Sequence, residues 1–433
     1  MKNYLSIIRN CVLIFLIGFI WSCGKVKKNE VKEDVLVKEV SAKDILGNTD
    51  YLAMSYGGYR HADHSIEPTL DELKEDMKLL YALGVRVVRT YKVHLPQAEN
   101  LLKAISELKQ NDPGFEMYVM LGAWIDCKNA WTDQAPIHNL ESDDNKPQME
   151  KAVALANQYP DIVKVIAVGN EAMVKWAATY YVEPWIILKW VNYLQDLKKE
   201  GKLSKDLWVT SSDNFASWGG GGEEYHVEDL NKLIKAVDFL SVHTYPMHDT
   251  HYQPDFWLKA EGLEGKTDME KIEISMLRAK KYAIMQYENV KKYMESLGVN
   301  KPIHIGETGW ASFSSGHYGT TGSKACDEYK EALYYQHMRD WTNEAGMACF
   351  YFEGFDEPWK GGDNSGNSEK HFGLFTVDGK AKYTLWDEVD KGTFKGLTRN
   401  GNPITKTYSG SKEALMKDVE VPPTSEEWLA NQK

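Results

Sequence analysis

Eight short apolar runs alternate with amphipathic stretches along most of the chain, and this alternation limits the fold more than any other feature. The runs are residues 51–57, 85–91, 117–124, 163–169, 207–212, 237–244, 302–306 and 347–353. Each is almost continuously apolar, as expected for strands that are buried on both faces. The pattern predicts an α/β fold, a (β/α)8 TIM barrel with a closed parallel sheet inside and helices outside.

The stretches between the runs have helical spacing. In residues 68–83, for example, Leu70, Leu73, Met77 and Leu80 recur every three or four positions. Similar patterns occupy residues 96–110, 147–159, 183–200, 227–236, 268–297, 327–345 and, in shorter form, 380–390. An open doubly wound sheet is the alternative, but the Gly-rich first turn typical of that fold is absent.

At 433 residues the chain has room for one large domain or two ordinary ones. Because the alternation is continuous, we predict a single barrel domain over residues 43–390. The polar residues 391–433 contain proline and glycine breaks and are predicted to be an extension that packs on the barrel or trails from it.

The N-terminus has the pattern of a targeting segment. Lys2 and Arg9 precede an apolar run that is too short to span a bilayer comfortably, and Cys23 follows the run directly. This arrangement resembles the signal and lipidation site of bacterial lipoproteins, with ordinary secretion as the alternative. We therefore predict a lipoprotein signal peptide over residues 1–23, lipidated at Cys23, and a flexible tether over residues 24–42, rich in Lys and Glu.

Such a signal implies an outer-membrane-anchored lipoprotein of a Gram-negative bacterium, on the periplasmic or the cell-surface face. The formal charge of −12 argues against binding to nucleic acid or to anionic membrane surfaces. We expect contact with a membrane only through the lipid anchor, and a monomeric protein.

Cysteine and histidine usage does not indicate a metal site. Cys127, Cys326 and Cys349 permit at most one disulfide, and their spacing is not that of a metal site. His243, His248, Asp249 and His251 are crowded together, but they lack the spacing of a helical metal site. We predict no metal and no cofactor.

Two of the apolar runs end on a glutamate. The run 163–168 continues as Gly-Asn-Glu171, and the run 302–305 continues as Gly-Glu307. A carboxylate where a buried strand meets its loop is costly to desolvate, which favours a functional role. Two such carboxylates, far apart in the chain, indicate a paired-carboxylate site of the kind that glycoside hydrolysis requires.

Other polar and aromatic residues also stand where the runs end. In a parallel barrel these ends meet at one mouth, where the chemistry takes place. They are Arg89 and Tyr91, Trp124 and Asp126, Asn170, Asp213 and Asn214, His243, Tyr245 and His248, Trp310, and Glu353, Asp356, Glu357 and Trp359. The 14 Trp and 24 Tyr residues are mostly expected in the core, but some are expected to line a carbohydrate cleft.

Four segments follow one another along the chain: Val168-Gly169-Asn170-Glu171, Gly306-Glu307-Thr308-Gly309-Trp310, Phe355-Asp356-Glu357-Pro358-Trp359-Lys360 and His371-Phe372-Gly373-Leu374-Phe375. Together they resemble glycoside hydrolase family 17, the β-1,3-glucanases. The resemblance covers about residues 48–390.

The resemblance implies retaining hydrolysis of β-1,3-glucosidic bonds in a laminarin-like β-1,3-glucan. By position, Glu171 corresponds to the catalytic acid/base and Glu307 to the nucleophile. A retaining site holds its two carboxyl groups about 5–5.5 Å apart. At that separation their charges repel, so one pKa rises and that group can act as the acid.

Substrate-binding roles follow for neighbouring residues. Asn170 is expected to bond to the sugar 2-hydroxyl, and Tyr245 and Arg89 are expected to keep Glu307 ionised. Trp310, Trp124 and Tyr91 are candidate platforms for sugar stacking. Glu353, Glu357 and Lys360 are candidates for substrate binding, with a salt-bridge lattice that holds their loop as an equal alternative.

Three functions remain open on the sequence. An exported β-1,3-glucanase acting on polysaccharide or oligosaccharide, with endo action favoured, is the leading interpretation. A β-1,3-glucanosyltransferase would use the same covalent intermediate, and a non-catalytic glucan-capture lipoprotein would need neither glutamate. The sequence does not decide endo against exo action, tolerance of β-1,6 branches, or the membrane face.

Overall fold

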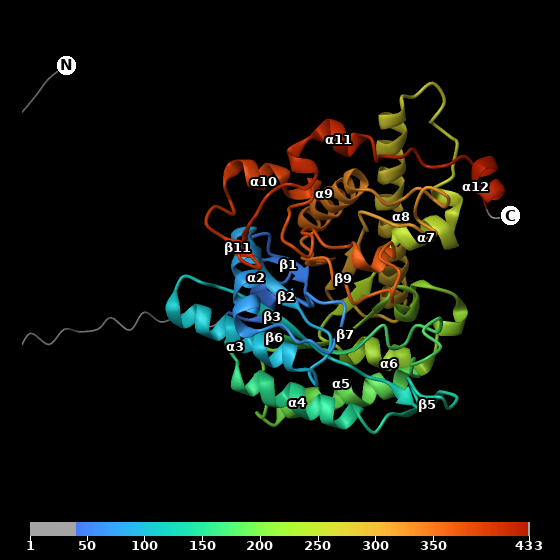
Figure 1. Cartoon of the computed structure of the whole chain (residues 1–433). Coiled ribbons are helices and arrows are strands. Elements are labelled where there is room, and N and C mark those ends of the chain that lie inside the picture. Colours follow the sequence, from blue (N-terminus) through green and yellow to red (C-terminus); the bar gives the residue numbers. More distant parts are fainter. Residues whose placement is uncertain (1–39, 432–433) are drawn as a thin grey trace, which may run out of the picture. The chain divides into compact units, whose positions relative to one another are not determined.

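Eight parallel strands close into a barrel at the centre of the molecule (Figure 1). The computed structural model describes residues 40–431, so the predicted signal peptide, Cys23 and most of the tether lie outside the described residues. Around the barrel the order is β1-β10-β9-β8-β7-β6-β3-β2. The strands are β1 (Leu52–Ser55), β2 (Val85–Arg89), β3 (Tyr118–Ala123), β6 (Val163–Asn170), β7 (Trp208–Asn214), β8 (Leu240–His243), β9 (Ile303–Gly309) and β10 (Cys349–Phe352). The predicted (β/α)8 fold is confirmed.

A helix follows each barrel strand along the chain, and these helices surround the barrel (Figure 1). They are α2 (Leu70–Ala82), α3 (Pro96–Asn111), α4 (Asn145–Gln158), α5 (Pro184–Lys199), α6 (Glu228–Ala236), α8 (Asp268–Ser296), α9 (Glu328–Glu344) and α10 (Trp386–Lys391). Capping boxes begin two of them, since the Thr69 hydroxyl accepts from the backbone N–H of Glu72 and Thr267 does the same for Glu270.

Several short elements lie outside the predicted pattern. They are the helices α1 (Ala42–Ile45) and α7 (Pro246–Tyr252), the hairpin of β4 (Cys127–Lys128) and β5 (Ile137–Glu141), the π-helix η1 (Ala216–Gly220), and the 3₁₀ turns η2 (Glu223–Tyr225), η3 (Pro254–Phe256), η4 (Ser368–Lys370) and η5 (Tyr383–Leu385). The hairpin, η1 and α7 lie in loops that follow the carboxyl ends of strands β3, β7 and β8.

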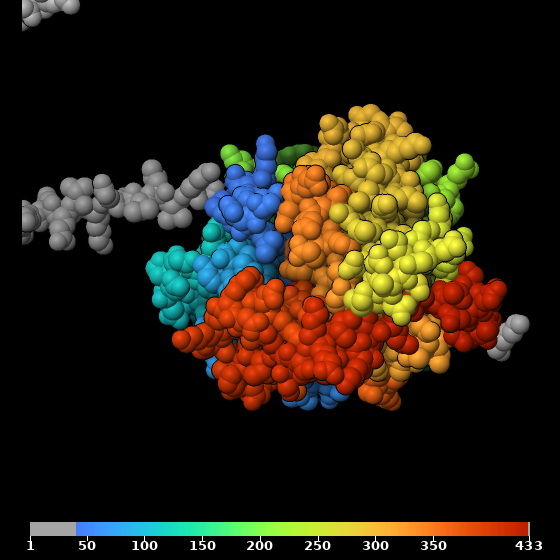
Figure 2. All heavy atoms as spheres, turned by 90° about the horizontal axis from the view of Figure 1, so that it is seen from above, coloured from blue at the N-terminus to red at the C-terminus, as the bar shows by residue number. Residues whose placement is uncertain are grey.

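The C-terminal residues pack on the barrel domain rather than trailing from it. They form β11 (Thr398–Arg399), β12 (Asn402–Pro403), η6 (Thr407–Gly410), α11 (Lys412–Met416) and α12 (Ser425–Asn431). Figure 2 shows this red segment running over the surface as far as the yellow segment that contains α7. Trp428 of α12 lies 5.2 Å from the His251 ring of α7, and Arg399 is fully buried.

Asp76 of α2 joins this extension to the barrel. Its carboxylate accepts from Arg399 Nε at 2.9 Å and from Arg60 Nη2 at 2.7 Å, and its side chain is fully buried. The Arg399 guanidinium also lies over the ring of Phe355, 4.1 Å from its centre. The extension is therefore held by a buried charge cluster, in which two cations share one carboxylate.

We expect Asp76→Ala to lower the free energy of unfolding by about 3–5 kcal/mol, because it leaves Arg399 and Arg60 buried with less compensating charge. Asp71→Ala is the matched control on the same helix, since its side chain is 97% exposed; it should change stability by less than about 0.5 kcal/mol. Urea denaturation of both variants measures the difference. Equal stability of the two variants would show that the cluster does not hold the extension.

Two further expectations concern the described residues. Cys127, Cys326 and Cys349 are all free, and Cys127 and Cys349 are buried as small apolar residues. Within residues 40–431, no helix is long and apolar enough to cross a membrane.

Candidate active site

Glu171 stands on a tight turn at the end of β6. Gly169 and Glu171 both have positive φ angles, 80° and 46°, and the backbone N–H of Glu171 donates to the Ser212 carbonyl at 3.0 Å. Non-glycine residues seldom adopt this backbone conformation, and strained residues of this kind cluster at active sites. The turn leaves the Glu171 side chain 15% exposed at the barrel mouth.

We expect Gly169→Ala to destabilise the protein by about 1–3 kcal/mol and to lower kcat, because a Cβ is strained at this φ and would displace the turn that carries Glu171. The new Cβ would lie 2.9 Å from Ala172 Cβ and 3.1 Å from Ile187 Cδ1. Gly201→Ala is the control, since Gly201 also has a positive φ, 72°, with open space around it. Thermal unfolding and kcat should separate the two, with kcat unchanged in Gly201→Ala. Equal kcat values would argue against a positioning role for the turn.

Glu307 lies within β9 and accepts hydrogen bonds from three side chains. Arg89 Nη1 donates to Oε2 at 2.7 Å, and the Tyr91 hydroxyl donates to the same oxygen at 2.8 Å. The Tyr245 hydroxyl donates to Oε1 at 2.6 Å. The expected contacts of Tyr245 and Arg89 with Glu307 are therefore present, and both oxygens of the carboxylate are held in fixed positions.

Arg89 links the two glutamate-bearing strands across the barrel. Besides Glu307, it donates from Nη1 to the Gly306 carbonyl at 2.8 Å and from Nη2 to Asn170 Oδ1 at 2.5 Å. Its side chain is only 1% exposed. One buried cation from β2 thus orients the segment before Glu171 and the carboxylate of Glu307 together.

The environment moves the pKa values of the two glutamates in opposite directions. Burial, followed by the negative charge of Glu307, raises the pKa of Glu171 to about 8. Burial also opposes ionisation of Glu307, but the positive charge of Arg89 and the bonds from Tyr245 and Tyr91 hold the pKa of Glu307 below its usual range. One carboxyl group is therefore protonated and the other ionised at neutral pH.

His243 of β8 is in direct contact with Glu171. Its Nδ1 lies 3.1 Å from Glu171 Oε1 and its Nε2 lies 2.7 Å from Ser212 Oγ. Burial lowers the pKa of His243 to about 4, so its ring is neutral at neutral pH and contributes no charge to Glu307. Both contacts are satisfied when Nε2–H donates to Ser212 and Nδ1 accepts the proton of Glu171.

A cleft of about 920 Å³ opens beside these groups. Its lining includes Glu307 and Asn170 and extends over the loops that follow β1, β2, β3 and β10. Its volume lies near the upper end of the range for ligand pockets. The aromatic residues that line it are Tyr56, Tyr59, His64, Tyr91, His94, Trp124, Trp131, Phe352 and Trp359.

Two residues expected to bind substrate do not reach the cleft. Trp310 is fully buried, and its Nε1 donates to the Ala325 carbonyl at 2.8 Å, so it offers no ring face to a sugar. Glu353 is 1% exposed and pairs with Lys360 at 3.0 Å. Core packing accounts for Trp310, so the expectation that it stacks on sugar was wrong. For Glu353 the structure shows the alternative, the salt-bridge lattice, through its pair with Lys360.

Of the other expected residues, five line the cleft, whereas Arg89 and Tyr245 contact Glu307 and are not part of the lining. Glu357 and Lys360 line it and pair with each other at 2.8 Å, so the salt-bridge lattice is present and also forms part of the wall. Trp124 lines it, with Lys92 Nζ 4.1 Å from the centre of its ring. Tyr91 lines it as well, but it contacts Glu307 through its hydroxyl rather than serving only as a flat platform.

The sequence places His243 and Trp359 at the barrel mouth but assigns no role to either, and it does not single out Trp131. His243 precedes Tyr245 by two positions, and residues two apart on a strand point to the same face. That spacing could have assigned His243 to the same side of the site as Tyr245. Trp131 and Trp359 lie in loops, and no periodic pattern of apolar residues in the sequence predicts the conformation of a loop. Among residues 40–431, no group of His, Cys, Asp and Glu is arranged to hold a metal ion.

The sequence profile of the BtgE/BtgC glycoside hydrolase domain matches residues 53–373, most of the chain and all eight barrel strands except the first residue of β1. The chain belongs to this family. The resemblance to β-1,3-glucanases inferred from the motifs is thereby confirmed.

Individual relatives agree with this assignment. An endo-laminarinase from Formosa Hel1_33_131 shares 67% identity with a TM-score of 0.88, covering 89% of this chain and 98% of that one. A probable glucan endo-1,3-beta-glucosidase of Aspergillus fumigatus is 26% identical over 81% of this chain, which spans 44% of that relative's length. The fold is shared with a glycoside hydrolase family 17 beta-1,3-glucanosyltransferase from Rhizomucor miehei. That structure is 20% identical, covers 78% of this chain and 97% of its own, and has a TM-score of 0.53.

Proposed function

We propose that this protein is a retaining, endo-acting β-1,3-glucanase that cleaves laminarin-like polysaccharide. The observation that carries the proposal is the pair of glutamates with opposite pKa shifts beside a cleft lined by aromatic residues. The family membership and the endo-laminarinase relative support the choice of linkage and of internal cleavage. An acid and a nucleophile at one site are the two groups that retaining hydrolysis requires.

In the first step, the ionised carboxylate of Glu307 attacks the anomeric carbon of the bound glucosyl residue. Glu171 gives its proton to the glycosidic oxygen as the bond between that oxygen and the anomeric carbon breaks, and the shortened chain leaves as an alcohol. The product is a glucosyl ester of Glu307. Tyr91, Tyr245 and Arg89 hold the nucleophile in position and ionised before the attack.

In the second step, Glu171 is ionised and takes a proton from water as the water oxygen attacks the anomeric carbon. The ester bond breaks, Glu307 regains its negative charge, and the sugar keeps its β configuration. Once Glu307 is esterified, its charge no longer raises the pKa of Glu171, which favours the switch from acid to base. His243 can then donate from Nδ1 to the Glu171 carboxylate, with its Nε2 accepting from the Ser212 hydroxyl.

The test is digestion of linear and branched β-1,3-glucans, with β-1,4-glucan as the control polymer. We expect a mixture of oligosaccharides from β-1,3-glucan at early times and no products from β-1,4-glucan. Proton NMR of the first products should show the β anomer. Release of α anomers, or of glucose alone from the chain end, would contradict the proposal.

Transfer to a sugar is the second candidate activity, because the covalent intermediate can react with a hydroxyl of another chain instead of water. Mass analysis of the products from a single laminari-oligosaccharide distinguishes the two activities. Products longer than the substrate would assign transfer, whereas only shorter products would assign hydrolysis.

We further propose that Cys23 carries a lipid that anchors the enzyme as a monomer to the outer membrane. The apolar run that ends directly before Cys23 supports this proposal. Expression of the full chain with Cys23→Ser should move the protein from the membrane fraction to the soluble fraction. Protease treatment of whole cells that carry the unmodified protein would distinguish the cell-surface face from the periplasmic one. Size-exclusion chromatography of Cys23→Ser, purified without detergent, would test whether the protein is a monomer.

A further inference from the structure

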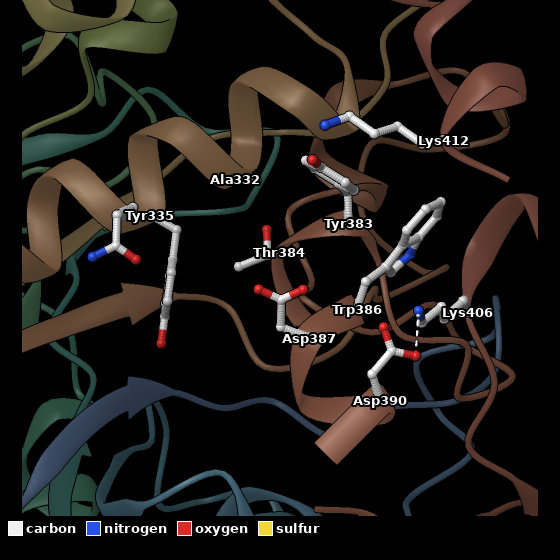
Figure 3. A pocket seen from close by; sticks show the side chains of 10 residues that line it. Ala332, Tyr335, Tyr383, Thr384, Trp386, Asp387, Asp390, Lys406 and Lys412 are labelled. Carbon is white, nitrogen blue, oxygen red and sulfur yellow. Dashed lines mark ion pairs between the residues drawn. The ribbon is translucent and has the colours of Figure 1, made fainter. Parts of the chain in front are cut away.

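A second pocket lies on the outside of the barrel and shares no lining residue with the cleft (Figure 3). Its volume is about 380 Å³, and it is formed by α9, by the segment of η5 and α10, and by the C-terminal extension. The residues that line it are Ala332, Tyr335, Gln336, Tyr383, Thr384, Trp386, Asp387, Asp390, Lys406 and Lys412.

Aromatic rings form opposite sides of this outer pocket, with Tyr335 on one side and Tyr383 and Trp386 on the other (Figure 3). The rings of Tyr383 and Trp386 meet edge to face at 5.2 Å, and Trp386 Nε1 donates to Thr407 Oγ1 at 3.2 Å. Tyr335 packs edge to face on Tyr351 at 4.9 Å. These contacts hold the three rings in fixed orientations, so little side-chain ordering would be needed when a ligand binds.

Polar groups without protein partners stand between the rings. The hydroxyl of Thr384 is buried and has no hydrogen-bond partner among the described residues. Asp387 is exposed, and within residues 40–431 its carboxylate accepts no hydrogen bond and forms no ion pair. Asp390, by contrast, is paired with Lys406 at 2.6 Å. Figure 3 shows Thr384 and Asp387 side by side between Tyr335 and Trp386.

We propose that the outer pocket is a second, non-catalytic binding site for a glucosyl residue of β-1,3-glucan; the identity of the sugar rests on the function proposed above. A sugar presents hydroxyl groups that donate and accept, and apolar C–H faces that suit flat rings. Two aspartates and two lysines leave the pocket without net formal charge, which disfavours a phosphate or another anion. An apolar ligand would leave the Thr384 hydroxyl and the Asp387 carboxylate unpaired.

A polymer held at the outer pocket while another stretch of it occupies the cleft gains effective concentration at the active site. A short oligosaccharide cannot occupy both places at once and gains nothing. The outer pocket should therefore lower KM for long glucans and leave the hydrolysis of short ones unaffected.

The first test is kinetic and uses Asp387→Ala and the nearly isosteric Thr384→Val. For laminarin we expect each to raise KM about three- to ten-fold, the effect of losing one or two hydrogen bonds, with kcat unchanged. For laminaritetraose both constants should match those of the unmodified protein. Asp255→Ala is the control, because Asp255 is also an exposed aspartate but lies on η3, outside the pocket; it should change neither KM nor kcat for either substrate. Equal KM values for laminarin in all four proteins would overturn the proposal.

The second test counts binding sites in Glu307→Gln by calorimetry with laminaritriose. Two sites are expected in Glu307→Gln, and in the double variant Glu307→Gln/Asp387→Ala the affinity of one of them should fall about three- to ten-fold. A single site with the same affinity in both proteins would overturn the outer pocket while leaving the glucanase intact. If instead the unmodified protein cleaves no glucan but Asp387→Ala still weakens one of two binding sites, the outer pocket stands and the proposed activity fails.

Discussion

Glu307→Gln is expected to lower kcat on linear β-1,3-glucan by at least about 10⁴-fold, because it removes the nucleophile without changing the shape of the side chain. The amide has no negative charge for attack on the anomeric carbon. It also cannot accept all three of the bonds that Arg89, Tyr91 and Tyr245 donate to the carboxylate. Oligosaccharide affinity should remain within several-fold of the original, so the loss appears in kcat rather than in binding.

Reducing-end release at neutral pH, together with thermal unfolding, measures this effect. Glu331→Gln is the matched control: Glu331 is another buried, ion-paired glutamate, 3.5 Å from Lys382 Nζ and outside the cleft. It should lower stability and leave kcat nearly unchanged. Retention of more than about 1% of kcat by Glu307→Gln would remove Glu307 from the nucleophile role.

The barrel could be predicted because its strands carry a strong local signal. Strands buried on both faces need continuous apolar runs, so each run marked a strand within a few residues. The motifs that carry Glu171 and Glu307 were visible for a related reason: a glutamate directly after such a run is unusual enough to draw attention. Barrel topology then brings Glu171 and Glu307 to one mouth, whatever their separation in sequence.

The walls of the cleft could not be predicted in the same way. Trp310 and Trp131 are both tryptophans in segments after barrel strands, yet Trp310 is fully buried and Trp131 is 59% exposed. Their difference arises from loop conformation, such as the positive φ of 61° at Trp131, and from the partner that each indole N–H finds. No local periodicity encodes either property, so the sequence favoured Trp310 as a stacking platform and did not single out Trp131.

Glu171→Gln should lower kcat/KM on β-1,3-glucan by about 10²–10⁴-fold, the usual contribution of a general acid. The pH dependence gives a sharper prediction. In the unmodified enzyme, Glu171 keeps its proton up to about pH 8 because its pKa is raised, so activity should fall as pH rises through that value. Glu307 is ionised well into the acid range because its pKa is lowered. In Glu171→Gln the fall in activity near pH 8 should disappear from the pH profile, whereas the fall at acid pH, where Glu307 becomes protonated, should remain.

A substrate with a good leaving group separates this role from a structural one. An activated aryl β-glucoside needs no proton on its leaving oxygen, so the first step should survive in Glu171→Gln, with a burst of the aryl alcohol followed by slow turnover. Azide attacks the glucosyl ester without needing a base, and it should restore turnover and release a β-glucosyl azide. Glu369→Gln is the control, because that glutamate bonds to His248 rather than to either catalytic group, and azide should not affect it. Recovery of an α-glucosyl azide, or no response to azide, would assign the acid/base role to another residue.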